Sequence, residues 1–149
     1  MKKYKISFSP LGLILFMIPM IPNLYWAIVP PKALELLDNE PVLPIFGVLQ
    51  EVCRFLMIGL LIMVVNTNRQ NTSHKKWFMV IGTLCMLAYF ISWVVYYNSI
   101  ITPYILMAMA VLPTIYFICA CLYQENYLAF CPAILFGGIH ITTTAINYL

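Results

Sequence analysis

The sequence predicts an all-α membrane protein in which about five helices cross a lipid bilayer as a bundle. Of its 149 residues, 63% are hydrophobic and only 9% are charged, whereas a soluble domain carries about a quarter charged residues. A soluble chain of this size would leave many of these apolar side chains in water. The apolar residues also form stretches of roughly 20 residues, the length that a membrane helix needs. We expect a single transmembrane domain with spans at roughly 8–30, 43–66, 77–98, 103–123 and 127–148.

The first span, 8–30, follows a basic start but runs too long for a signal peptide and lacks a small-residue cleavage site, so we expect it to be retained. Pro19 and Pro22 interrupt it just before Asn23. A proline has no backbone N–H and frees the carbonyl four residues earlier. The break is either a plain packing kink or a place where a cavity or a neighbouring helix satisfies the freed carbonyl.

The second span, 43–66, carries Gln50, Glu51 and Arg54 at the spacing that places them on one face of a helix. An unpaired charge at the centre of a membrane helix costs about 3 kcal/mol on the insertion scale. We therefore expect Glu51 and Arg54 to neutralise each other or a neighbouring group, and to point into the bundle. Two interpretations stay open, a structural ion pair and a binding or relay site.

The third and fourth spans, 77–98 and 103–123, are joined by a tight turn, and Pro113 introduces a weaker break in the fourth. Aromatic rings near predicted span ends usually lie at the headgroup boundary of the membrane. That interpretation applies to Trp26, Trp77, Trp93, Tyr96, Tyr97 and Tyr123.

The fifth span, 127–148, has a small residue at every fourth position, which would let another helix approach closely. These residues are Ala129, Ala133 and Gly137, and His140 flanks the same face. Thr144 and Asn147 continue the polar line toward the end of the chain, as a water-reachable opening would require.

The few charged residues predict the orientation of the bundle. The net charge is +3, and two basic clusters flank apolar spans: Lys2, Lys3 and Lys5, then Arg69, Lys75 and Lys76. The first connection is acidic, with Glu35, Asp38 and Glu40 against Lys32. By the positive-inside rule the N-terminus is cytoplasmic and the C-terminus external. This placement indicates a multi-pass protein of the plasma membrane, with the bilayer as its partner and not a nucleic acid.

Polar groups from several spans fall at one depth when the helical rise of about 1.5 Å per residue is applied to the predicted orientations. We expect a ligand-binding site in the outer half of the membrane, where Arg54 would engage an anion and Glu51 would balance it. Its candidate residues are Asn23, Gln50, Glu51, Arg54, Trp93 and His140.

Neither a metal nor a cofactor is predicted. The five cysteines lie in apolar segments without a metal-ligand spacing and are most simply small buried hydrophobes. His74 lies in the predicted cytoplasmic connection, on the opposite side from His140, so the chain offers no bis-histidine pair for haem. No linear motif of an intramembrane hydrolase is present. An enzyme in which Glu51 and His140 shuttle a proton remains an alternative.

The sequence also resembles known groups of membrane proteins. The runs PNLYW at 22–26, PP at 30–31 and EVCR at 51–54 resemble uncharacterised small five-span membrane proteins of Firmicutes, which implies a bacterial plasma membrane. A looser likeness is to one EamA-type half of the drug/metabolite transporter superfamily. It is carried by RFL at 54–56, VLPT at 111–114, QEN at 124–126 and the Gly137–Gly138 pair. The second likeness implies an N-inside unit that dimerises into a ten-span carrier.

Three functional hypotheses follow. The first is a transporter-like or small-ligand-binding bundle with the polar site described above. The second is an accessory or immunity-type subunit, whose small-residue face at Ala129, Ala133 and Gly137 docks a membrane partner. The third is the membrane-embedded enzyme.

Overall fold

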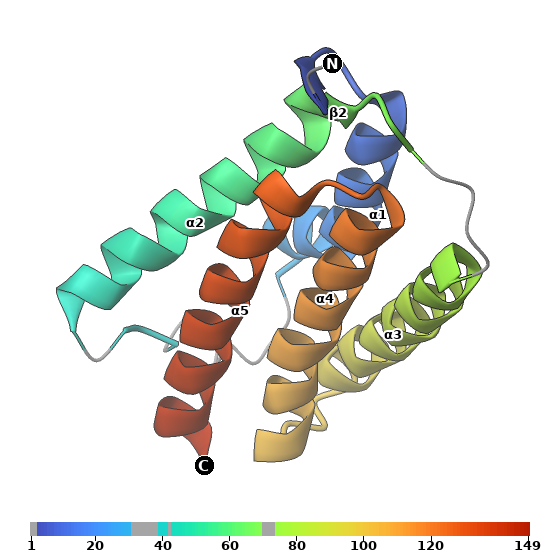
Figure 1. The fold of residues 1–149 in the computed structure, drawn as a ribbon. Coiled ribbons are helices and arrows are strands. Elements are labelled where there is room, and N and C mark those ends of the chain that lie inside the picture. Colours follow the sequence, from blue (N-terminus) through green and yellow to red (C-terminus); the bar gives the residue numbers. More distant parts are fainter. Residues whose placement is uncertain (1–2, 31–38, 42, 70–73) are drawn as a thin grey trace.

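Five helices make up most of the described chain. The computed structural model describes residues 3–30, 39–41, 43–69 and 74–149. Each of its five helices is long and apolar enough to cross a membrane, which confirms the predicted fold class and an integral membrane protein. The two chain ends lie at opposite ends of the bundle, as five crossings require (Figure 1). The helices are α1 (Pro10–Ile28), α2 (Pro44–Met63), α3 (His74–Tyr97), α4 (Pro103–Tyr123) and α5 (Tyr127–Tyr148).

Helix α4 is the central element of the bundle. Half of its most apolar window is buried, a larger share than in any other helix. Helix α3 packs along one side of α4 and α5 along another, and α5 packs in turn against α2 (Figure 1). Helix α1 touches α2, α4 and α3 over shorter stretches. Because α4 is apolar around its whole circumference, it can be surrounded by protein without exposing a polar face to its neighbours.

The proline break in α1 is satisfied by the neighbouring helix α4. Pro19 cannot donate to the carbonyl of Leu15, and the Tyr116 hydroxyl donates to that oxygen at 2.8 Å instead. Four residues beyond Pro19, the Asn23 side-chain amide donates to the Pro19 carbonyl and to the Tyr89 hydroxyl, both at 3.0 Å. The break therefore anchors α1 to α4 and α3 through polar contacts inside an apolar bundle.

Tyr116→Phe is expected to lower the free energy of unfolding by about 1–3 kcal/mol, because it leaves the Leu15 carbonyl without its donor. Tyr123→Phe is the matched control on the same helix, and it should change stability by less than about 0.5 kcal/mol. Unfolding in mixed micelles with increasing sodium dodecyl sulfate measures both variants. Equal losses in the two would contradict the role given to Tyr116.

A short two-stranded sheet stands at the N-terminal end of the bundle. The strand β1 (Tyr4–Ile6) pairs antiparallel with β2 (Val64–Asn66). The last three residues of the expected second span, roughly 43–66, thus form a strand and not helix. The backbone N–H of Ser9 continues the pairing by donating to the Ile62 carbonyl at 2.7 Å. The N-terminal segment thus supplies partners for the end of α2, whose last carbonyls have no partner within the helix.

The turn between α4 and α5 is tied to the end of α2. The Asn126 side-chain amide donates to the carbonyls of Leu60, at 2.8 Å, and Val64, at 3.0 Å. Its oxygen accepts the Ala129 N–H at 3.2 Å and so caps α5. The preceding residue, Glu125, pairs with Lys75 at 2.8 Å, so α3 is also held at this end.

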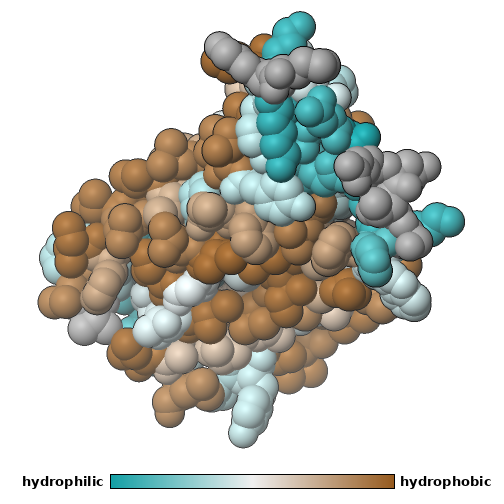
Figure 2. Space-filling view, in the orientation of Figure 1, coloured by the Kyte–Doolittle hydropathy of each residue, from teal (hydrophilic) through white to brown (hydrophobic). Residues whose placement is uncertain are grey.

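The face shown in Figure 2 is mostly apolar along the helices and hydrophilic at the end that carries the N-terminus. This end holds the described basic residues that the sequence places at the cytoplasmic face. The orientation itself stays a prediction from the positive-inside rule. Three charged residues of the acidic connection used for that prediction, Lys32, Glu35 and Asp38, lie outside the described residues.

Several aromatic and cysteine side chains occupy places that the sequence did not predict. Trp93 and Tyr96, expected at the headgroup boundary, are 5% and 0% exposed, and their rings meet edge to face. Trp77 is 66% exposed, as an interfacial anchor would be. Cys131 points outward, whereas Cys53, Cys119 and Cys121 are buried as expected. Proximity to a span end was therefore a poor guide to whether a ring faces lipid or protein.

The small-residue face of α5 is used inside the chain. Ala129 and Ala133 are 0% and 1% exposed, and Gly137 is also buried. A Cβ atom on Gly137 would overlap the Thr114 methyl group of α4. The close helix approach predicted from these residues is thus made with α4, and the face is not available to dock a partner protein.

Candidate functional site

A cavity of about 330 Å³ lies between the helices, and all five of them contribute to its walls. The residues that α1, α3 and α5 contribute lie mainly in the second halves of those helices, so the cavity occupies the half of the bundle away from the N-terminus. The volume is near the lower end of the range for small-molecule pockets. Most of the lining is apolar or aromatic. The polar side chains among the described lining residues, besides the ring groups of Trp26, Tyr89 and Trp93, are Asn23, Asn39, Gln50, Arg54, Thr114, His140 and Thr144.

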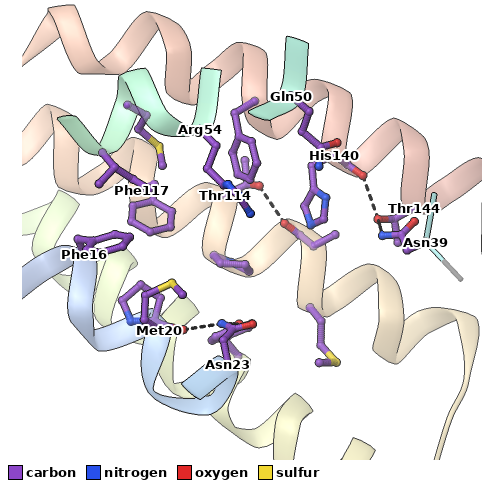
Figure 3. Close-up of a pocket in the computed structure, with 18 of the residues that line it drawn as sticks. Phe16, Met20, Asn23, Asn39, Gln50, Arg54, Thr114, Phe117, His140 and Thr144 are labelled. Atoms are coloured by element: carbon purple, nitrogen blue, oxygen red, sulfur yellow. Dashed lines mark hydrogen bonds between the residues drawn. The ribbon is translucent and has the colours of Figure 1, made fainter. Parts of the chain in front are cut away.

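Helical spacing explains why these side chains share one cavity. Gln50 and Arg54 are four residues apart on α2, and His140 and Thr144 are four apart on α5, so each pair lies on one face of its helix. Gln50, Arg54 and His140 form one wall, and Asn23 of α1 lies on the opposite wall (Figure 3). The packing of α5 against α2 brings the two polar faces together.

Five of the six predicted site residues line the cavity, and the sixth does not. Glu51 lies beside the lining and forms an ion pair with Arg54. Its side chain is 44% exposed, as is that of Arg54, so the pair sits at the edge of the bundle and not deep inside it. The residues that do line the cavity are Asn23, Gln50, Arg54, Trp93 and His140.

Four buried polar atoms around the cavity have no hydrogen-bond partner among the residues that the structure describes. They are Trp26 Nε1 on α1, Gln50 Oε1 on α2, Trp93 Nε1 on α3 and His140 Nδ1 on α5. Buried polar atoms are nearly always bonded, and leaving one unbonded costs about 1–3 kcal/mol. Four such atoms from four helices around one cavity indicate a site built to receive polar groups of another molecule.

The ion pair leaves part of the Arg54 guanidinium available. Arg54 Nη2 binds Glu51 Oε2, and the guanidinium lies 5.3 Å from the centre of the Phe55 ring. A guanidinium carries five N–H donors. Pairing through one terminal nitrogen leaves the Nε and Nη1 donors for other acceptors. The pair therefore balances the charge of Arg54 without using up its hydrogen-bonding capacity.

Residues of the first connection cover the end of the cavity near the C-terminus. Asn39 donates to the Thr144 hydroxyl at 3.0 Å, and Asn147 donates to Asn39 Oδ1 at 3.0 Å and to the Glu40 carbonyl at 2.9 Å. The sequence places a water-reachable opening along Thr144 and Asn147. In the structure these two side chains instead form hydrogen bonds with Asn39 and with the Glu40 carbonyl.

Sequence reasoning missed several lining residues. Trp26 was assigned to the headgroup boundary, and Asn39 belongs to a connection whose path no helical pattern predicts. Tyr89 could have been found, because it stands four residues before Trp93 and so shares its helix face. Its hydroxyl accepts the Asn23 amide across the cavity wall. Met57 and Thr114 carry no signal that separates them from ordinary packing residues.

The arrangement bears on the enzyme and metal hypotheses. No group of three His, Cys, Asp or Glu side chains that could hold a metal ion occurs in the described part of the chain. Glu51 pairs with Arg54 and lies outside the lining to which His140 contributes. The geometry thus does not place Glu51 opposite His140 for proton transfer to a bound substrate.

Comparisons with known proteins found no relative of this chain. No protein-family model matches the chain, and neither a curated protein nor a solved structure matches it. The likenesses to five-span proteins of Firmicutes and to an EamA-type unit therefore stay predictions from the sequence.

Proposed function

We propose that this membrane protein binds a small amphipathic molecule in the cavity between its five helices. The observation that carries the proposal is a set of four buried polar atoms around that cavity that have no partner among the described residues. They belong to Trp26, Gln50, Trp93 and His140. A bound molecule with polar groups would satisfy these atoms, and its apolar part would contact the surrounding hydrophobic side chains. A transporter-like protein and a receptor would both need such a site.

The bilayer is the natural source of this molecule. Apolar lining favours a ligand that partitions into lipid, and the half-exposed Arg54 stands where the cavity wall meets the surface of the bundle. The location of the site in the outer half of the membrane rests on the predicted orientation. Binding energy would come from the apolar body of the ligand, while the few polar groups would fix its orientation.

Tryptophan fluorescence offers a direct test. Trp26 and Trp93 line the cavity, whereas Trp77 is exposed on α3 outside it. In a Trp77→Phe protein in lipid nanodiscs, octanol carrying a terminal bromine should quench the two remaining tryptophans with a saturable dependence on concentration. A Trp26→Phe/Trp93→Phe protein retains Trp77 alone and should show only the linear quenching of a probe dissolved in lipid.

Filling the cavity should abolish binding. Ala110 is 2% exposed and lines the cavity, so Ala110→Phe in the Trp77→Phe background is expected to weaken bromo-octanol binding at least tenfold. Ala108→Phe on the same helix is the matched control, because Ala108 does not line the cavity. Gel filtration and helical circular dichroism establish that both variants fold. Linear quenching of the Trp77→Phe protein, or equal binding by the two alanine variants, would contradict the proposed function.

A further inference from the structure

We propose that the ligand of this cavity is uncharged and that the Glu51–Arg54 ion pair sets this preference. The inference rests on the proposed binding function and specifies the chemistry of the ligand. It replaces the anion expected from the sequence, because the structure gives Arg54 a counter-ion before any ligand arrives.

The charge around the cavity disfavours an anionic ligand. Arg54 is the only Lys, Arg, Asp or Glu among the described lining residues, and Glu51 already neutralises it. An anionic ligand would leave one uncompensated negative charge in a region of low dielectric constant, which is expensive within a membrane. At the end near the C-terminus the nearest described charged residue is Glu40, whose carbonyl accepts from Asn147. The described part of the site therefore has no second cationic side chain that could neutralise an anionic ligand.

The available groups are both donors and acceptors of hydrogen bonds. The indoles of Trp26 and Trp93 and the free part of the Arg54 guanidinium can only donate. Gln50 Oε1 can only accept. His140 Nδ1 does either, depending on where the ring proton sits. The matching head group offers both an acceptor and a donor, as a hydroxyl group does. A quaternary ammonium head group offers neither.

The remaining surface of the cavity is apolar and includes Met57 of α2. Phe16 of α1 and Phe117 of α4 lie on this side, away from the polar wall (Figure 3). These side chains suit a hydrocarbon chain or ring system. The ligand class is thus a neutral, hydroxyl-bearing amphiphile small enough for about 330 Å³.

Two brominated probes with the same chain separate the charge preference from binding itself. In the Trp77→Phe protein in nanodiscs of neutral lipid at neutral pH, bromo-octanol is expected to quench saturably, with bromo-octane sulfonate binding at least tenfold more weakly. The sulfonate stays anionic at any accessible pH. The two probes therefore compare a charged with an uncharged head group on the same chain. This comparison needs no change at the ion pair.

Glu51→Gln should reverse the preference. Removing the counter-ion frees Arg54, so sulfonate binding is expected to strengthen at least tenfold while bromo-octanol binding changes less than threefold. Glu40→Gln is the matched control, because it removes an acidic residue near the cavity without freeing Arg54. It should leave the ratio of the two affinities within threefold of the starting protein. The double variant Glu51→Gln/Arg54→Met removes both charges and should gain no sulfonate binding.

The outcomes separate the two proposals. If the sulfonate binds the Trp77→Phe protein as tightly as bromo-octanol, or if folded Glu51→Gln leaves the affinity ratio unchanged, the inference about charge is overturned and the binding site stands. If neither probe quenches saturably in the Trp77→Phe protein, the proposed function itself fails.

Discussion

Replacing Asn126 by alanine is expected to lower the free energy of unfolding by about 3 kcal/mol. The side chain is 1% exposed and makes three hydrogen bonds, to the carbonyls of Leu60 and Val64 and from the N–H of Ala129. Alanine would remove the cap of α5 and leave two carbonyls at the end of α2 without this donor. No water is readily available to replace it in so buried a position.

The matched control is Asn98→Ala. Asn98 is exposed just after the end of α3, and among the described residues its side chain bonds only to the Val94 carbonyl. Its loss should therefore lower stability by less than about 1 kcal/mol. Both variants can be compared with the unaltered protein by unfolding in mixed micelles. A loss for Asn126→Ala no greater than that for Asn98→Ala would show that the tie between α2 and α5 is unimportant.

Gly12→Ala should be nearly as damaging, with a loss of about 3 kcal/mol. A Cβ atom at Gly12 would overlap the backbone carbonyl oxygen of Leu61 on α2 and stand 3.1 Å from the Ser9 hydroxyl oxygen. That hydroxyl caps α1 by accepting the Gly12 N–H at 3.0 Å. A backbone carbonyl within a helix cannot rotate away as a side chain could. The two helices would have to separate at this contact.

Gly59 provides the control for this substitution. It lies on α2 with no atom within 4 Å of an added Cβ, so Gly59→Ala should leave stability unchanged or raise it by up to about 1 kcal/mol. The difference between the two glycine variants measures the close approach of α1 and α2 alone, since the helix propensity change is the same. Indistinguishable midpoints for the two variants would rule out that approach.

The fold class could be predicted because a membrane helix needs only length and apolar composition. The expected spans differ from α1 and α3 by one to three residues at their ends, and they coincide with α4 and α5. The strand at Val64–Asn66 could not be predicted in this way. Its pairing with Tyr4–Ile6 joins segments 60 residues apart in sequence, and no local periodicity distinguishes it from the end of an apolar helix.

The level of the candidate site along the helices could be predicted, but the direction of each side chain could not. Helical rise and spacing bring Gln50, Arg54 and His140 to one level, which is where they meet in the structure. Depth does not say which way a side chain points around the helix. Glu51 is adjacent to Gln50 and therefore turned about 100° from it, and this rotation places it outside the lining. The same limit caused Trp26 to be assigned to the membrane interface.

The most direct test of the central claim is a high-resolution structure of the purified protein in lipid nanodiscs. If the cavity is a binding site, density for a non-protein molecule or ordered water will contact the four polar atoms Trp26 Nε1, Gln50 Oε1, Trp93 Nε1 and His140 Nδ1. If these four atoms are instead bonded to the protein, and the walls close on each other without a cavity, the Glu51–Arg54 pair serves structure alone and the binding proposal is wrong.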